Sequence, residues 1–97
     1  MEKYALLGRL EAKPGKEQEV AAFLKSALPI AENENATVKW YGLQFGPSSF
    51  GIFDTFETEA GRKEHLEGEI AASLMKHAGD LLSQDPIIEF VELLAVK

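Results

Sequence analysis

The sequence predicts an α+β fold with the element order β-α-β-β-α-β and an antiparallel sheet. Two patterns carry this prediction. Short segments that alternate in polarity or are rich in β-branched and aromatic residues are typical of strands. Two longer segments repeat apolar residues every three or four positions, which is typical of helices that lie on a core. The length of 97 residues suits one domain that spans residues 1–97.

The first half of the chain supplies one strand and one helix. Lys3–Ala12 is predicted as a strand, and Pro14-Gly15 breaks it. Lys16–Glu32 follows with the apolar spacing of a helix. Because Pro29 removes a backbone hydrogen bond inside this segment, we expect a kink or an early end there.

The middle of the chain predicts a β-hairpin. Its strands span Thr37–Phe45 and Phe50–Phe56, and Gly46-Pro47-Ser48-Ser49 between them has strong turn chemistry. If Phe45 faces Phe50, the remaining register follows by counting. The predicted pairs are Leu43 with Ile52, Tyr41 with Asp54, Gln44 with Gly51, Gly42 with Phe53, and Trp40 with Thr55.

The second half adds a helix and a final strand. Glu59–Leu82 is predicted as one helix with Thr58 as its N-cap, and Ile87–Val96 is predicted as the last strand. Gly61 and Gly68 disfavour a helix, so its first turns are expected to be irregular. The complete order is that of the ferredoxin-like arrangement, in which both helices cover one face of the sheet.

Most of the predicted strands are apolar on both faces. The face of an antiparallel sheet that meets water is normally polar, and a large exposed apolar patch usually marks an interface. This chain is too short to supply a second cover of its own. We therefore expect a homodimer in which two sheets pack face to face.

Composition and charge exclude several function classes. The net charge of −6 and the absence of a basic run disfavour binding to nucleic acid. Without cysteine, the chain can form no disulfide, thiol nucleophile or cysteine-ligated metal site. No run approaches the ~20 apolar residues of a membrane span, and Met1 to Tyr4 lacks the basic start of a signal peptide. We expect a cytoplasmic protein that does not associate with membranes.

Two histidines are candidates for chemistry. His65 comes one residue before Leu66, the first member of the apolar stripe, so it could point between the second helix and the sheet. With an ordinary pKa near 6.5, such a histidine can shuttle a proton or orient a hydroxyl group. The alternative is a helical histidine with a structural hydrogen bond. His77 is interpreted as a surface residue.

The same histidines give little support for a metal site. His65 and Glu69 are four residues apart, and His77 and Asp80 are three apart. Neither pair supplies the three or four ligands that zinc or iron requires. The sequence therefore predicts no metal site.

An aromatic pocket is a second candidate site. Glycines near Trp40 and Phe53 leave room for a planar ligand on the face that carries Trp40 and Gln44. The alternative is that these glycines relieve strand twist while the aromatic residues fill the core.

The opposite face pairs Tyr41 with Asp54 in the predicted register. A hydrogen bond between the phenol and the carboxylate at the dimer interface is one interpretation. In the other, the buried carboxylate has a raised pKa and acts as a base.

A family resemblance is carried by two stretches of the chain, LLGRLEAKPGKEQEVAAFL and ALPIAENENATVKWYGLQFGPSSFGIFDTFETEAGRKEHL. The first resembles the opening strand and helix of the antibiotic biosynthesis monooxygenase family. The second resembles its middle section, where a strand pair leads into a helix with a histidine at the place of His65. The shared features are the apolar pattern, Lys13-Pro14-Gly15, the acidic helix start and His65.

The resemblance implies a dimeric α+β barrel and cofactor-independent oxygenation of a quinol or polycyclic phenol. Such a substrate itself reduces oxygen once it is deprotonated. The resemblance implies His65 as the catalytic group and places Trp40, Phe53 and Gln44 around the aromatic ring. Gly8 stands near the position where haem-degrading relatives have an asparagine, so haem degradation is not expected.

The leading hypothesis is therefore a small cofactor-independent monooxygenase. The alternative is a non-catalytic dimeric domain that binds a small hydrophobic molecule. A third hypothesis is an interaction module in which side chains fill the space between Trp40, Phe53 and the second helix.

Overall fold

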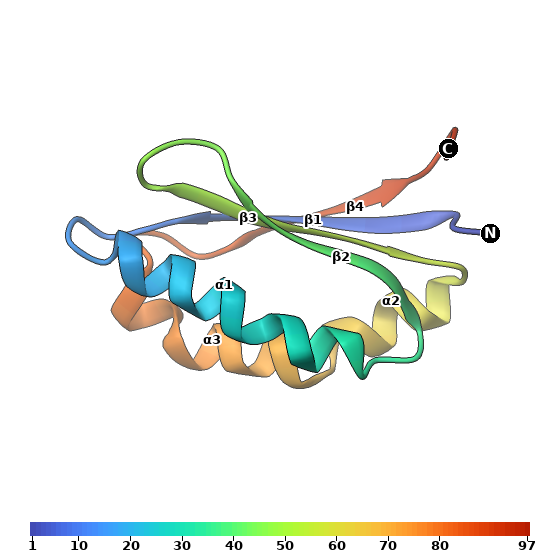
Figure 1. The fold of residues 1–97 in the computed structure, drawn as a ribbon, viewed down its shortest axis with the longest axis horizontal. Helices are drawn as coiled ribbons and strands as arrows, with labels where there is room; N and C mark the ends of the chain where they lie inside the picture. Colours follow the sequence, from blue (N-terminus) through green and yellow to red (C-terminus); the bar gives the residue numbers. More distant parts are fainter.

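The computed structural model describes residues 1–97 and confirms the ferredoxin-like α+β fold. All helices lie on one face of a four-stranded antiparallel sheet, and the other face is bare (Figure 1). The strand order is β2-β3-β1-β4. The elements are β1 (Tyr4–Glu11), α1 (Glu17–Glu32), β2 (Thr37–Gln44), β3 (Ser49–Phe56), α2 (Glu59–Leu66), α3 (Glu69–Leu81) and β4 (Ile87–Glu92).

The helices differ from the prediction at two places. Helix α1 continues through Pro29 to Glu32, so the expected early end is wrong. The second predicted helix is divided into α2 and α3 at Glu67-Gly68, where glycine disfavours continuation. The predicted N-cap is confirmed, since the Thr58 hydroxyl accepts a hydrogen bond of 2.9 Å from the backbone N–H of Gly61.

The register of the β2–β3 hairpin is shifted by one residue from the prediction. Gln44, not Phe45, lies opposite Phe50, and Trp40 lies opposite Asp54. The reason is the turn: the backbone N–H of Phe45 donates to the carbonyl of Ser49 at 2.7 Å, which extends pairing by one position.

This shift decides which side chains share a face. Because side chains alternate along a strand, Trp40 and Asp54 share the helix-covered face, while Tyr41 and Phe53 share the bare face. The core on the covered face is built mainly from Leu10, Val20, Leu24, Phe50, Ile52 and Leu82. The Tyr41 and Phe53 rings stack on the bare face with centroids 6.4 Å apart.

Strand β4 is shorter than predicted, ending at Glu92 instead of Val96. Beyond it the chain leaves the sheet, and Leu94 is 99% exposed. In Figure 1 this tail rises away from the helical layer. None of the three helices is long and apolar enough to cross a membrane.

Candidate functional site

His65 is held inside the molecule by the short helix α2. The helix begins after the Thr58 cap. Near its C-terminal end, the His65 ring packs against the Phe56 ring with centroids 5.4 Å apart. Gly61 allows α2 to approach the loop after α1, since a Cβ atom there would lie 3.2 Å from the Cβ of Ala36. As a result, the His65 side chain is only 7% exposed.

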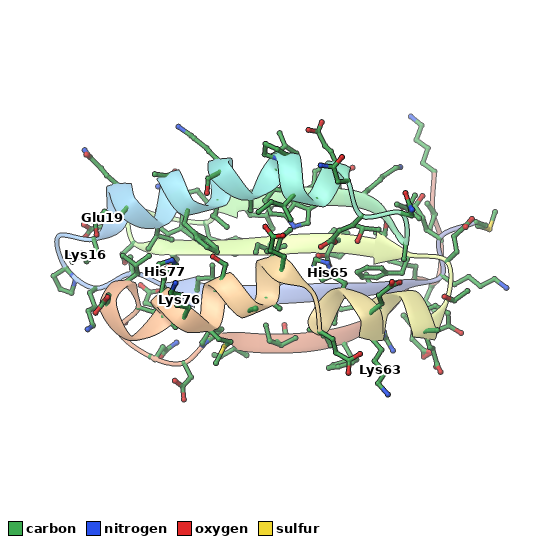
Figure 2. All side chains as sticks on the ribbon, turned by 90° about the horizontal axis from the view of Figure 1, so that it is seen from below. Lys16, Glu19, Lys63, His65, Lys76 and His77 are labelled. Carbon is green, nitrogen blue, oxygen red and sulfur yellow. The ribbon has the colours of Figure 1, made fainter.

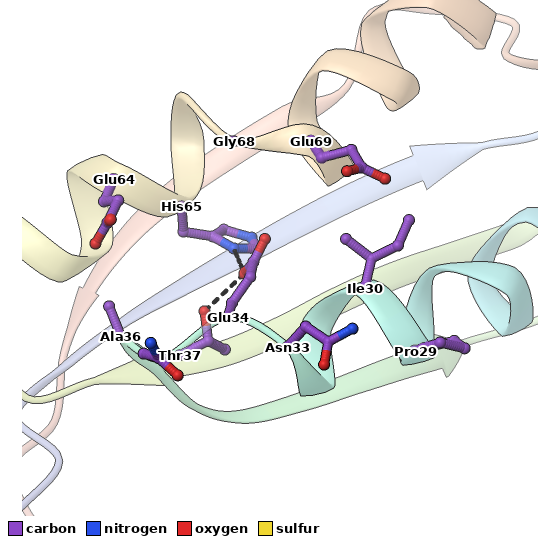
Figure 3. Close-up of a pocket in the computed structure, with 11 residues that line it drawn as sticks. Pro29, Ile30, Asn33, Glu34, Ala36, Thr37, Glu64, His65, Gly68 and Glu69 are labelled. Carbon is purple, nitrogen blue, oxygen red and sulfur yellow. Dashed lines mark hydrogen bonds and ion pairs between the residues drawn. The ribbon is translucent and has the colours of Figure 1, made fainter.

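Two carboxylates contact opposite sides of the His65 ring. Its Nδ1 lies 2.7 Å from Oε1 of Glu34, and its Nε2 lies 2.8 Å from Oδ2 of Asp54. Figure 3 shows Glu34 reaching from the loop after α1 to the imidazole, with Thr37 beside it. The Thr37 hydroxyl donates to the same Glu34 oxygen at 2.8 Å. We call Glu34, His65 and Asp54 the carboxylate–histidine cluster.

Asp54 and His65 hold their protons more tightly than they would in water. Burial raises the pKa of the Asp54 carboxyl, and the hydrogen bond and charge of His65 offset this only in part. Burial alone would lower the pKa of His65, but its contacts with Asp54 and Glu34 outweigh this and raise the pKa. A neutral imidazole has one N–H and one lone pair, so it can satisfy only one ionised carboxylate. The geometry therefore favours a doubly protonated His65.

The cluster lies between two spaces of different character. On the outside is an open polar cleft of about 540 Å³, lined by residues that include Asn33, Glu34, Thr37, Glu64, His65 and Glu69. On the inside is a cavity of about 50 Å³ between the sheet and α2–α3. Its walls include the apolar side chains of Leu6, Leu10, Ile52, Ile70, Leu74 and Ile88. Asp54 and His65 are the polar end of this inner cavity.

Asp54 carries acceptor capacity that nothing in the fold satisfies. Its side chain is 1% exposed, and while Oδ2 lies 2.8 Å from Nε2 of His65, Oδ1 has no hydrogen-bond partner. An unsatisfied buried carboxylate is costly and is more typical of a site than of a packed core.

The structure does not gather the predicted pocket residues around His65. Trp40 and Gln44 line a different space, an apolar groove of about 420 Å³ between α1 and β2. Phe53 lies on the bare face of the sheet because of the shifted register. Trp40 is half-buried, and its Nε1–H is buried without an acceptor. In one subunit, then, Phe53 cannot flank a ring bound beside Trp40.

The predicted Tyr41–Asp54 pair is wrong for the same reason. Asp54 is the buried carboxylate that the sequence suggested, but it faces His65 under the helices. Glu34 was missed, because it stands in the polar loop Asn33-Glu34-Asn35 and carries no local signal. Only the packing of α2 against this loop brings it to the imidazole.

The second histidine has a different environment. His77 is exposed on α3, edge-on to the Phe23 ring, and lies well apart from His65 along the helical layer (Figure 2). Both ring nitrogens of His65 are engaged by carboxylates, so neither is free to bind a metal with Glu69. No group of three or more histidine and carboxylate side chains has a geometry that could hold a metal ion.

Comparisons with known proteins define the relationships of the chain. No protein-family model matches it, and no curated protein matches it. The solved structure of NE2512, a protein of unknown function from Nitrosomonas europaea, is 60% identical, covers 100% of this chain and 94% of its own, and superposes with a TM-score of 0.98.

More distant structures share the fold. PA3566 from Pseudomonas aeruginosa is 18% identical with a TM-score of 0.83, over 98% of this chain and 97% of that one. An antibiotic biosynthesis monooxygenase is 14% identical with a TM-score of 0.79, over 95% of this chain and 99% of that one. At this identity the likeness establishes the ferredoxin-like fold alone. The chain itself belongs to the same family as NE2512 of Nitrosomonas europaea.

Proposed function

We propose that this protein is a cofactor-independent monooxygenase that acts on a quinol or a related phenol. In the proposed reaction, one hydroquinone and one O₂ give one hydroxyquinone and one water. The hydroquinone loses four electrons, and O₂ accepts four, so the reaction needs no external reductant. The protein has to bind the ring in a dry space and accept a proton from its hydroxyl group.

The observation that carries this proposal is the carboxylate–histidine cluster at the polar end of an apolar cavity. A phenol loses its proton readily only to a group whose pKa is raised and which is within hydrogen-bond reach. Burial raises the pKa of Asp54, and the adjacent walls of the inner cavity are apolar. The shared fold of an antibiotic biosynthesis monooxygenase supports the same reaction class.

The size of the inner cavity places a condition on the proposal. A space of about 50 Å³ holds a water molecule, whereas a benzene ring has been accommodated in a cavity of about 150 Å³. The substrate therefore has to displace side chains of α3. This helix has one fully buried residue, Ile70, and its other wall residues Ala71 and Leu74 are half-buried. Because so few of its side chains are buried, α3 can move at a modest cost in packing.

Oxygen uptake with a panel of benzo- and naphthohydroquinones tests the proposal, with a protein-free control for spontaneous oxidation. With ¹⁸O₂, a monooxygenase places one labelled atom in the hydroxyquinone, whereas simple oxidation to the quinone places none. His65→Ala should lower the rate at least 100-fold near neutral pH. The matched control is His77→Ala, which removes the exposed histidine and should leave the rate unchanged. Failure of every quinol to acquire label would contradict the proposal.

We also propose that the protein is a homodimer through the bare face of the sheet. On this face, three apolar residues are each about half exposed: Tyr41, Phe45 and Ile87. The same face also carries Leu7, Leu43 and Phe53. An apolar surface of this kind is unfavourable in water and is typical of an interface. Light scattering at micromolar concentration checks the mass. A 10.7 kDa monomer would contradict the homodimer.

A second candidate function has its own supporting observation. The groove between α1 and β2 is about 420 Å³ and mostly apolar, and none of the three cluster residues lines it. It suits a non-catalytic domain that binds a small hydrophobic molecule. Trp40 is the single tryptophan and lines this groove, so quenching of its fluorescence reports binding there. Quenching by an aromatic ligand that leaves oxygen uptake unaffected would favour this function.

A further inference from the structure

His65 has no ring nitrogen available to a substrate. Nδ1 faces Glu34 at 2.7 Å, and Nε2 faces Asp54 at 2.8 Å. A general base needs a free lone pair within about 2.6–3.2 Å of the proton that it removes. A ring in the inner cavity would have to break one of these two contacts before His65 could act as that base.

Asp54, unlike His65, has an acceptor atom that no other group in the structure occupies. It lines the inner cavity, it is 1% exposed, and its Oδ1 has no hydrogen-bond partner. An ionised carboxylate has room for several donors, and here His65 occupies only the Oδ2 side. Asp54 therefore offers an acceptor oxygen without a partner at the polar end of the cavity, where a hydroxyl group would bind.

We infer that Asp54 is the catalytic group that accepts the substrate's hydroxyl proton, and that Glu34 is a positioning residue that keeps His65 cationic beside it. This inference rests on the proposed function. The proton passes from the hydroxyl oxygen to Oδ1 of Asp54, and the electron pair of the broken O–H bond stays on the substrate. The same proton, together with a second one that the substrate loses as it is oxidised, later goes to the oxygen atom that leaves as water, so the cluster ends the cycle unchanged.

The charges around His65 support this division of roles. Glu34 faces it from the loop after α1, Asp54 faces it from β3, and Glu64 and Glu69 line the same polar cleft from α2 and α3. No lysine or arginine lines that cleft. A cationic imidazole amid these carboxylates keeps the deeply buried Asp54 ionised before the substrate arrives.

A nitrophenol tests the proton acceptor without any oxygen chemistry, since its ionised form absorbs visible light and O₂ does not oxidise it. Below the pH at which free nitrophenol ionises, the wild type should bind it as the phenolate, whereas Asp54→Asn should bind it as the neutral phenol. In His65→Gln, phenolate should form only at higher pH, because Asp54 then lacks its neighbouring cation. Phenolate formation in Asp54→Asn below the pH at which free nitrophenol ionises, or its loss at every pH in His65→Gln, would overturn the assignment, and so would a wild type that binds no nitrophenol.

The role of Glu34 is read from the ¹⁵N chemical shifts of the His65 ring, which distinguish a doubly protonated from a neutral imidazole. In Glu34→Gln, His65 should lose its second proton at lower pH than in the wild type. Glu69→Gln is the matched control, since Glu69 lines the same cleft without contacting His65, and it should shift the titration much less. Equal titrations of wild type and Glu34→Gln would refute this role. Labelled-oxygen turnover decides the proposed function separately: turnover that survives Asp54→Asn would leave the function standing and remove this inference.

Discussion

Nε2 of His65 lies 2.8 Å from Oδ2 of Asp54, whose side chain is 1% exposed. The pair joins the middle of β3 to the end of α2, so it connects the sheet to the helical layer. Removing one partner of a buried pair leaves the other uncompensated, which is strongly destabilising. The stability of the fold and the chemistry of the site therefore depend on the same protons.

The stability of the protein should fall as pH rises above about 6.5, the value for histidine in an unfolded chain. The contacts of His65 raise its pKa in the folded state, so the fold binds a proton that the unfolded chain has already lost. The free energy of unfolding should then decrease by up to about 1.4 kcal/mol per pH unit, the value for one proton, until the folded pKa is passed. Urea unfolding between pH 5 and 9, roughly the range in which histidine titrates, measures this slope. The slope should largely disappear in His65→Gln, and an identical slope in that variant would assign it to other groups.

Two glycines should respond to alanine in opposite directions. A Cβ atom at Gly51 would lie 2.7 Å from the carbonyl oxygen of Gly8 and 2.9 Å from the Phe45 ring, so the strand or the ring has to move. Gly51→Ala should cost about 1–3 kcal/mol of stability, the range for overpacking. Gly79 lies in α3 with open space around it, so Gly79→Ala should stabilise by about 0.5–1 kcal/mol. Denaturant midpoints of the two variants check both signs.

Filling the inner cavity should block the substrate while sparing the cluster. Ala71 lines this cavity from α3, and phenylalanine there would occupy the space that a ring needs. We expect Ala71→Phe to lower kcat/KM for a quinol at least tenfold while leaving the ¹⁵N titration of His65 in place. Ala72→Phe is the matched control, because Ala72 is the exposed neighbour on the same helix. Equal kinetics in both variants would mean that the substrate binds elsewhere.

A charge on the bare face should dissociate the proposed homodimer. Tyr41 is 48% exposed on that face, and a glutamate in its place would meet the apolar sheet of the second subunit. Tyr41→Glu should halve the mass measured by light scattering and leave the helical circular dichroism unchanged. Met75→Glu, at a residue that is 63% exposed on α3, should keep the mass of the wild type.

Local patterns in the sequence determine the elements and their order. The apolar residues of Glu17–Glu32 recur every three or four positions, which predicts a helix from the local sequence alone. The turn residues after Gln44 predict the hairpin in the same way, and the structure confirms both elements. Gly68, which disfavours a helix, indicated the irregularity that divides α2 from α3. The register of β2 and β3 was harder to predict, because it depends on one hydrogen bond of the turn, from Phe45 to Ser49, which no local pattern specifies.

What only the tertiary structure decided is the environment of His65. Its sequence position marked it as a candidate, but its partners come from a loop and a strand that are 31 and 11 positions away along the chain. The one-residue register shift turned Asp54 from a proposed interface residue into the buried partner of that histidine, and it moved Phe53 to the opposite face. The physical reason is that pKa values and cavities depend on which groups meet in space, and a strand changes face with every residue.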